Sequence, residues 1–217
     1  MTATIGSGHD GSLAPKPAEQ LAAAARAIES GEVAAFPTET YYGLGADPRN
    51  PEALRKILRI KGRSAADKPL LLLAASLEQV APWISDFPRD FDLLAARFWP
   101  GPLTLVLPSV AGLAAELLGP GGGVAVRVCA HPLARELMLL SGTAITGTSA
   151  NRAGMPPCAD AQTVEVELGD RLAAIVDGGP TPGGQPSTLL DLCGPQPRLL
   201  RSGAVSEAAL RTIVRLV

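Results

Sequence analysis

Aromatic residues, cysteine and histidine are scarce in this sequence of 217 residues. Phe, Trp and Tyr make up 4% of it, so Leu, Val, Ile and Ala must form most of the core. The three cysteines, Cys129, Cys158 and Cys193, are far apart and form no CxxC pair. With only His9 and His131 beside them, they predict neither a zinc site nor a disulfide framework. A reducing, cytoplasmic setting is the simplest interpretation.

Long apolar runs and a large excess of one charge are also missing. No apolar run approaches the roughly 18–20 residues that a membrane helix needs. Residues 1–15 lack the basic start and apolar centre of a signal peptide, and we expect a flexible leader there, before a single domain at 16–217. The net charge of −2 argues against a protein that coats nucleic acid with its whole surface, but it allows a local basic cleft.

Hydrophobic residues make up 47% of the chain, and their spacing alternates between helical and strand-like segments. Helices are predicted at residues 17–32, 50–62, 76–84, 88–99, 131–142, 160–172 and 206–214. Strands are predicted at residues 33–36, 69–75, 102–108, 124–130, 143–148, 173–179, 187–192 and 197–203. This order indicates a layered α/β domain, and the strands after residue 170 lack intervening helices, which favours a mixed sheet.

Three polar clusters follow predicted elements. The first, FPTETYYGLG at 36–45, places hydroxyl groups directly after a strand, where small ligands bind in α/β folds. A turn whose hydroxyl groups are hydrogen-bonded within the protein would have the same sequence pattern, so that interpretation remains open. The second, KGRSAADKP at 61–69, carries Lys61, Arg63 and Lys68, whose ammonium and guanidinium groups suit phosphate oxygens. Cations just past a helix end also complement the helix dipole, so both interpretations remain open.

The third cluster is GTSAN at 147–151, where small residues allow a ligand to approach the backbone. The chain has no Walker A loop, and GPGGG at 119–123 is not a dinucleotide-binding fingerprint but is typical of a flexible connection. We expect His131 to start a helix, and no catalytic triad is recognisable. Many anion-binding groups with few acid–base groups indicate catalysis by positioning and charge stabilisation, as in nucleotidyl transfer.

Together these stretches resemble the YrdC/TsaC family of threonylcarbamoyl-AMP synthases. The matching segments occur in the family's order: FPTETYYGLG, KGR…KPLLLL, WPGPLTLVL, VAVRVCAHP, TSAN and STLLDL…LLRSGAV. The resemblance implies a twisted mixed sheet with helices packed around a basic cleft. It also implies conversion of ATP, L-threonine and bicarbonate to L-threonylcarbamoyl-AMP and pyrophosphate. The product would pass to the tRNA threonylcarbamoyltransferase machinery, which forms N6-threonylcarbamoyladenosine at position 37. Longer family members carry an additional C-terminal domain, for which this chain is too short.

The resemblance implies roles for individual residues as well. The family's catalytic KxR and SxN signature falls on Lys61, Arg63, Ser149 and Asn151. Its ATP contacts fall on Arg63, Lys68, Gly123, Ser149, Pro157 and Arg201. Its threonine contacts fall on Thr40, Arg127, Gly147 and Ser187. No residue is implied as a metal ligand, and Mg²⁺ is expected to be held mainly by the nucleotide.

The sequence departs from the family at several of these places. Leu73 stands where many members have a histidine, Pro186 replaces a glutamate, Ser202 replaces a proline, and Gly123 replaces a threonine. The segment between KGR and the next proline is one residue longer than in many members. These departures concern the geometry of the site and substrate choice more than the reaction class.

Three other functions compete with this one. A double-stranded RNA binder could use the same basic cleft, and weak RNA binding without sequence preference is expected even of the synthase. A carbamoyl-adenylate enzyme that uses carbamoyl phosphate, as in hydrogenase maturation, usually has a longer chain with zinc fingers. A paralogue with the same fold and a different substrate is the third.

Overall fold

The structure is a computed structural model that describes residues 16–64 and 68–217, so the leader expected at 1–15 lies outside it. Within these residues, nine strands form one sheet in the order β7-β1-β2-β6-β3-β5-β4-β8-β9. The strands are β1 (Ala34–Phe36), β2 (Gly43–Gly45), β3 (Leu71–Ala74), β4 (Leu103–Pro108), β5 (Gly123–Val128), β6 (Ile145–Ser149), β7 (Ala174–Ile175), β8 (Thr188–Asp191) and β9 (Arg198–Arg201). The pairs β1–β7, β3–β5 and β4–β8 are parallel and the other pairs are antiparallel, which confirms the mixed sheet.

Helices cover both faces of the sheet, and the side-chain alternation of the strands decides which residues face them. On one face, α1 (Pro17–Glu29) and α5 (Pro132–Leu140) pack together over a core that includes Phe36 and Leu73. The neighbouring Ala35 and Leu72 point to the opposite core. That core also contains buried residues of α2 (Pro51–Lys61), α4 (Phe91–Phe98), α6 (Ala161–Leu168) and α7 (Glu207–Arg211).

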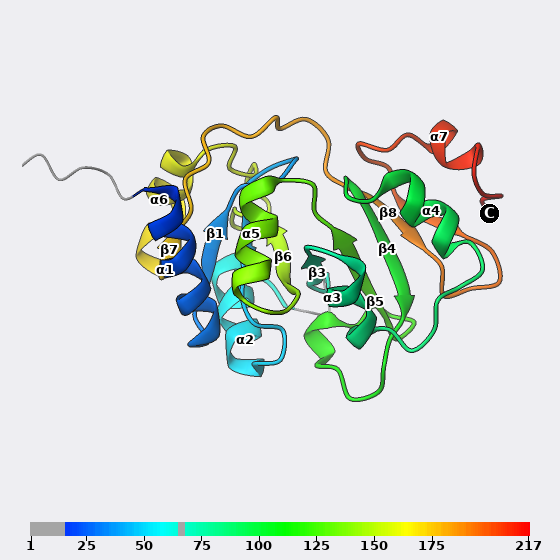
Figure 1. Ribbon diagram of the computed structural model, residues 1–217, viewed down its shortest axis with the longest axis horizontal. Coiled ribbons are helices and arrows are strands. Elements are labelled where there is room, and N and C mark those ends of the chain that lie inside the picture. Colours follow the sequence, from blue (N-terminus) through cyan, green and yellow to red (C-terminus); the bar gives the residue numbers. More distant parts are fainter. Residues whose placement is uncertain (1–15, 65–67) are drawn as a thin grey trace, which may run out of the picture.

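The molecule is elongated along the sheet. Figure 1 shows α1, α6 and β7 at one end and α4, α7 and β8 at the other. None of the helices in the described part of the chain is long and apolar enough to cross a membrane.

Both ends of α2 lie where the sequence predicts, because local capping residues mark them. The Asn50 side chain caps the helix by accepting hydrogen bonds from the backbone N–H groups of Glu52 (3.0 Å) and Ala53 (3.2 Å). Gly62 ends it with a φ of 64°, a left-handed conformation that glycine adopts without steric cost. Lys61 is therefore the last helical residue.

Several predicted boundaries differ from the observed ones. The sequence did not predict β2, a three-residue strand in which a Cβ on Gly45 would lie 2.7 Å from Phe36 Cε1. The helix predicted at 76–84 is α3 (Leu77–Val80) followed by a 3₁₀ turn, and the helix predicted at 206–214 covers only Glu207–Arg211. The strand predicted at 173–179 covers only Ala174–Ile175. GPGGG is a hydrogen-bonded turn that leads into β5, with Gly119 and Gly122 as partners.

Candidate functional site

A pocket of about 430 Å³ lies where several loops meet the sheet. Its walls come from the segment after β1, the approach to β3, β5, the end of β6 and the loop before β8. Eight of the twelve residues predicted for the site line it: Thr40, Lys68, Arg127, Gly147, Ser149, Pro157, Ser187 and Arg201. The fold thus brings together residues that lie up to 161 positions apart in the sequence.

The strand register determines which residues of the sheet form one wall of the pocket. Leu73 pairs with Arg127 on β5, and Leu71 pairs with Gly147 on β6, so these four residues share one face of the sheet. Gly147 has no room for a side chain, because a Cβ there would lie 2.5 Å from Leu73 Cγ. A ligand on this face would therefore meet the backbone of Gly147 beside the apolar side chain of Leu73.

Three cations line the pocket, Lys68, Arg127 and Arg201, and none of its lining residues in the described part of the chain is acidic. Burial, together with the charges of Arg201 and Arg63, lowers the pKa of Lys68 below its ordinary value. Burial and the charge of Arg127 likewise lower the pKa of Arg201. Because like charges repel, a bound anion would stabilise all three side chains.

Arg201 and Ser187 form one corner of the pocket. The Arg201 guanidinium donates to the Ser187 carbonyl from Nε (3.1 Å) and Nη2 (2.8 Å), and Nη2 also reaches Ser187 Oγ at 3.1 Å. The Ser187 hydroxyl lies 2.8 Å from the hydroxyl of Thr104, which is fully buried. These bonds fix the guanidinium across β8 and β9, so its position does not depend on a ligand.

The segment after β1 supplies two buried hydroxyl groups. Thr38 Oγ1 lies 3.1 Å from Thr40 Oγ1 and donates to the carbonyl of Tyr41 at 2.7 Å. The hydroxyl of Tyr41 donates to the carbonyl of Gly184 at 2.8 Å. The backbone N–H of Gly183 donates to the carbonyl of Thr40 at 2.8 Å. The loop before β8 is therefore tied to the segment that carries Thr40.

Arg127 is 5% exposed, and its acidic neighbour is Glu39, which belongs to the same segment as Thr40. Arg127 Nε lies 3.5 Å from Glu39 Oε1. The other carboxylate oxygen, Oε2, accepts hydrogen bonds from the Cys129 thiol (2.8 Å) and the Ala130 N–H (3.3 Å). Sequence reasoning noticed Glu39 only as a member of the polar cluster and assigned it no role, since its partners lie about 90 positions away.

Lys61 lies behind the pocket wall and is 4% exposed. Its Nζ donates to the Ser149 carbonyl and to Asn151 Oδ1, both at 2.6 Å, and reaches Ser149 Oγ at 3.4 Å. Burial and the charges of Arg63 and Lys68 lower the pKa of Lys61 to about 7. The KxR and SxN stretches therefore meet through Lys61, which joins the end of α2 to the end of β6.

Four predicted site residues, Lys61, Arg63, Asn151 and Gly123, do not line the pocket. Lys61 bonds Asn151, as described above, and Arg63 donates from Nη1 to the carbonyl of Lys68. Gly123 starts β5, and a Cβ there would lie 2.5 Å from Cys193 Sγ. The catalytic and binding roles assigned to these residues stay predictions.

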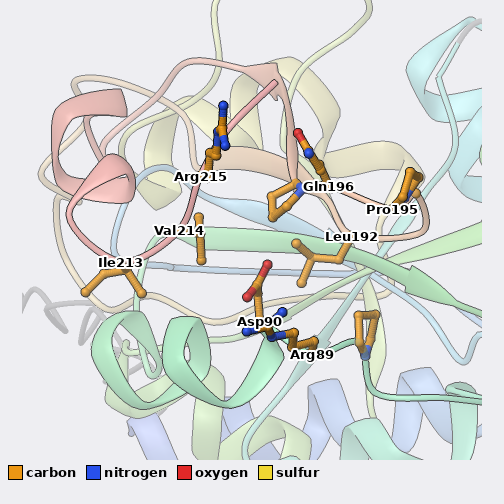
Figure 2. A pocket seen from close by; sticks show the side chains of 11 residues that line it. Arg89, Asp90, Leu192, Pro195, Gln196, Ile213, Val214 and Arg215 are labelled. Atoms are coloured by element: carbon orange, nitrogen blue, oxygen red, sulfur yellow. The ribbon is translucent and has the colours of Figure 1, made fainter.

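A second pocket, of about 450 Å³, lies away from these residues. Figure 2 shows Arg89, Asp90 and Arg215 around it, with Gln196 and apolar side chains of the chain's last residues. It contains none of the predicted site residues. The first pocket is the candidate site, because it combines clustered cations, buried hydroxyl groups and a backbone left uncovered at Gly147.

Comparisons with known proteins identify the family of the chain. The model of the Sua5/YciO/YrdC family, described as "Telomere recombination", matches residues 26–203. The threonylcarbamoyl-AMP synthase of Bacillus subtilis (strain 168) is 40% identical over 196 residues, and that of Vibrio campbellii is 40% identical over 181 residues. A crystal structure of Pyrococcus abyssi Sua5 complexed with L-threonine superposes with a TM-score of 0.86 at 38% identity over 93% of this chain.

The relatives differ in length. This chain spans 56% of the Bacillus subtilis protein and 60% of the Pyrococcus abyssi chain, but 96% of the Vibrio campbellii protein. The matched region contains every residue of the candidate pocket.

Proposed function

Because the chain belongs to the Sua5/YciO/YrdC family, we propose that it is a threonylcarbamoyl-AMP synthase. It would convert L-threonine, bicarbonate or CO₂, and ATP to L-threonylcarbamoyl-AMP and pyrophosphate. The observation that supports this most is the pocket itself, in which Lys68, Arg127 and Arg201 face one space lined by hydroxyl groups. A site of this kind suits two anionic substrates that must approach one another.

The reaction requires charge neutralisation more than acid–base chemistry. The threonine amine adds to CO₂ and releases a proton to the solvent, which gives a carbamate anion, and a carbamate oxygen then attacks the α-phosphorus of ATP. The bond from that phosphorus to the bridging oxygen breaks, and pyrophosphate leaves. Both reactants are negatively charged, so fixed cations lower the barrier by offsetting their repulsion.

The geometry supports separate places for the two substrates. We assign the threonine carboxylate to Arg127, with Thr40 and Ser187 beside it and the Gly147 backbone as the wall. We assign the phosphates to Lys68 and Arg201, near Ser149 and Pro157. Lys61 would act by holding Ser149 and Asn151, since its Nζ already bonds both residues.

Mg²⁺ would enter as the nucleotide complex. The pocket lining offers hydroxyl and carbonyl oxygens but no carboxylate, and no cluster of His, Cys, Asp and Glu suited to a metal lies within the described residues. Mg²⁺ favours several oxygen ligands, which the phosphates and water supply. Its chemistry there would be to neutralise charge on the leaving pyrophosphate.

Mass spectrometry of the reaction products tests this function. The purified chain is incubated with ATP, L-threonine, bicarbonate and Mg²⁺, and reactions without threonine or bicarbonate serve as controls. We expect L-threonylcarbamoyl-AMP and an equal amount of pyrophosphate in the complete reaction alone. A folded, ATP-binding chain that forms no adenylate would overturn the proposal. Transfer of the product to a tRNA-modifying partner is a further proposal, which addition of that machinery and tRNA would test.

A further inference from the structure

Three buried side-chain polar atoms lack a hydrogen-bond partner within the described residues, and all three lie in one part of the molecule. They are Glu39 Oε1, Arg127 Nε and His131 Nδ1. Buried polar groups normally find partners, because an unpaired one costs about 1–3 kcal/mol. A concentration of such atoms beside the pocket indicates that the arrangement is kept for function.

The position of Glu39 in the fold is unusual for a hairpin loop. It lies between β1 and β2, whereas its partners Cys129 and Ala130 directly follow β5. Strands β2, β6 and β3 separate β1 from β5 in the sheet. The segment after β1 therefore reaches a strand that three others separate from β1 in the sheet, and Glu39 fastens it beside Arg127.

The two oxygens of Glu39 have different tasks. Oε2 is fixed by the Cys129 thiol and the Ala130 N–H. Burial raises the pKa of Cys129 to about 12, so the thiol stays protonated and donates a hydrogen bond to Oε2. Among residues 16–64 and 68–217, Oε1 finds no hydrogen-bond donor, and it lies 3.5 Å from Arg127 Nε. The carboxylate is thus held from one side and presents its free oxygen to the arginine.

The Arg127 side chain lies between Glu39 and the candidate pocket. Its Nε faces Glu39, and the same side chain lines the candidate pocket. Glu39 is its acidic partner among the described residues, and Glu39 itself does not line the pocket. A guanidinium held at Nε keeps its terminal nitrogens for a second carboxylate, which it can bind with two parallel hydrogen bonds.

We propose that Glu39 is a positioning residue that holds Arg127 in the geometry that binds the substrate carboxylate. This inference rests on the proposed function, because it takes Arg127 as the threonine-carboxylate group. Glu39 does not touch the substrate, and it acts only through Arg127. Its effect is therefore confined to the amino-acid side of the pocket.

Steady-state kinetics of Glu39→Gln test the proposal, because glutamine has the same shape without the charge. We expect the KM for threonine to rise by about 10- to 100-fold, since misplacing a binding group by about 1 Å costs that much, while the KM for ATP stays nearly unchanged. Glu32→Gln is the matched control, because it removes a carboxylate that pairs with Lys56 outside the pocket. An unchanged threonine KM in Glu39→Gln overturns the proposal, as does an equal rise for both substrates.

A double-mutant cycle separates positioning from direct contact with the substrate. In an Arg127→Met background, Glu39→Gln should change the threonine KM by less than about twofold, because the residue through which it acts is gone. Effects that multiply would show that Glu39 influences threonine binding independently of Arg127, and they would overturn the proposal.

Unfolding experiments keep the test valid if a single variant folds poorly. Removing either charge leaves the other buried and unpaired, so the double variant should be more stable than the sum of the single losses predicts. Additive losses would overturn the inference, whatever the substrate. If instead the wild-type chain forms no adenylate while this coupling is present, the proposed function fails and the ion pair remains.

Discussion

Arg127 belongs both to the buried sheet and to the lining of the candidate pocket. It is almost fully buried, and after burial itself the charge of Arg127 is the second cause that lowers the pKa of the neighbouring Arg201. A buried guanidinium with one loose acidic partner is expensive to keep in an empty site. A substrate carboxylate would provide the missing hydrogen bonds, so part of the binding free energy comes from relieving this arrangement.

The first prediction concerns Arg127→Ala. A hydrogen bond to a charged group contributes about 1.5–3 kcal/mol, so the KM for threonine should rise by roughly 10- to 150-fold. The KM for ATP should change far less, because Lys68 and Arg201 remain. Initial rates with each substrate varied in turn provide the measurement, and Arg198→Ala, which removes a surface ion pair with Asp191, is the control. An equal effect on both substrates would mean that Arg127 supports the fold and does not select threonine.

The second prediction concerns the pH dependence that Lys61 imposes. The pKa of Lys61 is lowered from 10.5 to about 7 in the folded protein, chiefly by burial. The folded state therefore disfavours the ammonium form. This destabilisation is complete below about pH 7 and decreases as the pH rises toward 10.5, where the unfolded chain also loses the proton.

Comparing wild type with Lys61→Met tests this sign. Methionine has a similar length and no charge. The unfolding free energy of wild type minus that of the variant should therefore rise between pH 7 and pH 9. The contribution per unit of pH cannot exceed about 1.4 kcal/mol for one proton. Urea denaturation at several pH values provides the measurement. A difference that is flat, or that falls with rising pH, would show that the pKa of Lys61 is not lowered in the folded protein.

At the scale of elements, β6 carries much of the site, because Gly147 and Ser149 belong to it and Asn151 follows it. The third prediction is that Gly147→Ala destabilises the protein by about 1–3 kcal/mol, since the added methyl group overlaps Leu73 and forces the core to shift. Equilibrium unfolding in urea measures the loss. Gly121→Ala is the matched control, because no atom of the described part of the chain lies within 4 Å of a Cβ there.

Adding Leu73→Ala to Gly147→Ala should restore part of the lost stability relative to the sum of the two single effects. The overlap at 2.5 Å involves Leu73 Cγ, which that change removes. Strict additivity would mean that the strand moves as a whole, and that Leu73 is not what excludes a side chain at residue 147.

Local signals made most helices and strands predictable, and long-range contacts explain the rest. Asn50 and Gly62 mark the ends of α2 because capping depends on a few neighbouring residues. In contrast, β2 contains two glycines, which disfavour a strand. It forms because it pairs with β1 and β6 and packs against Phe36, and residues close in the sequence do not predict these contacts. The cations of the pocket could be named from motifs. The contacts of Glu39 could not, because its partners follow β5, which three strands separate from β1 in the sheet.

The whole molecule has a net charge of −2, yet its cations are unevenly placed. Lys68, Arg127 and Arg201 line the candidate pocket, while Lys56, Arg59 and Arg171 line a smaller, more open hollow beside α2. In that hollow Lys56 pairs with Glu32 and Arg59 with Glu52, so much of its charge is already neutralised. An extended polyanion should therefore favour the candidate pocket.

The last prediction is that single-stranded RNA binds weakly, without sequence preference, and in competition with ATP. Three phosphate contacts to single-stranded RNA correspond to a slope of about −2 in a plot of log K against log salt concentration, because each contact contributes roughly −0.7. Fluorescence anisotropy of a labelled RNA, over a range of salt and of ATP concentrations, provides both readouts. Arg201→Ala should weaken binding and make the slope shallower by about one contact, whereas Arg171→Ala should leave both unchanged. If saturating ATP leaves the RNA affinity untouched and Arg171→Ala lowers it, RNA binds at the hollow beside α2 and the two polyanions do not share a site.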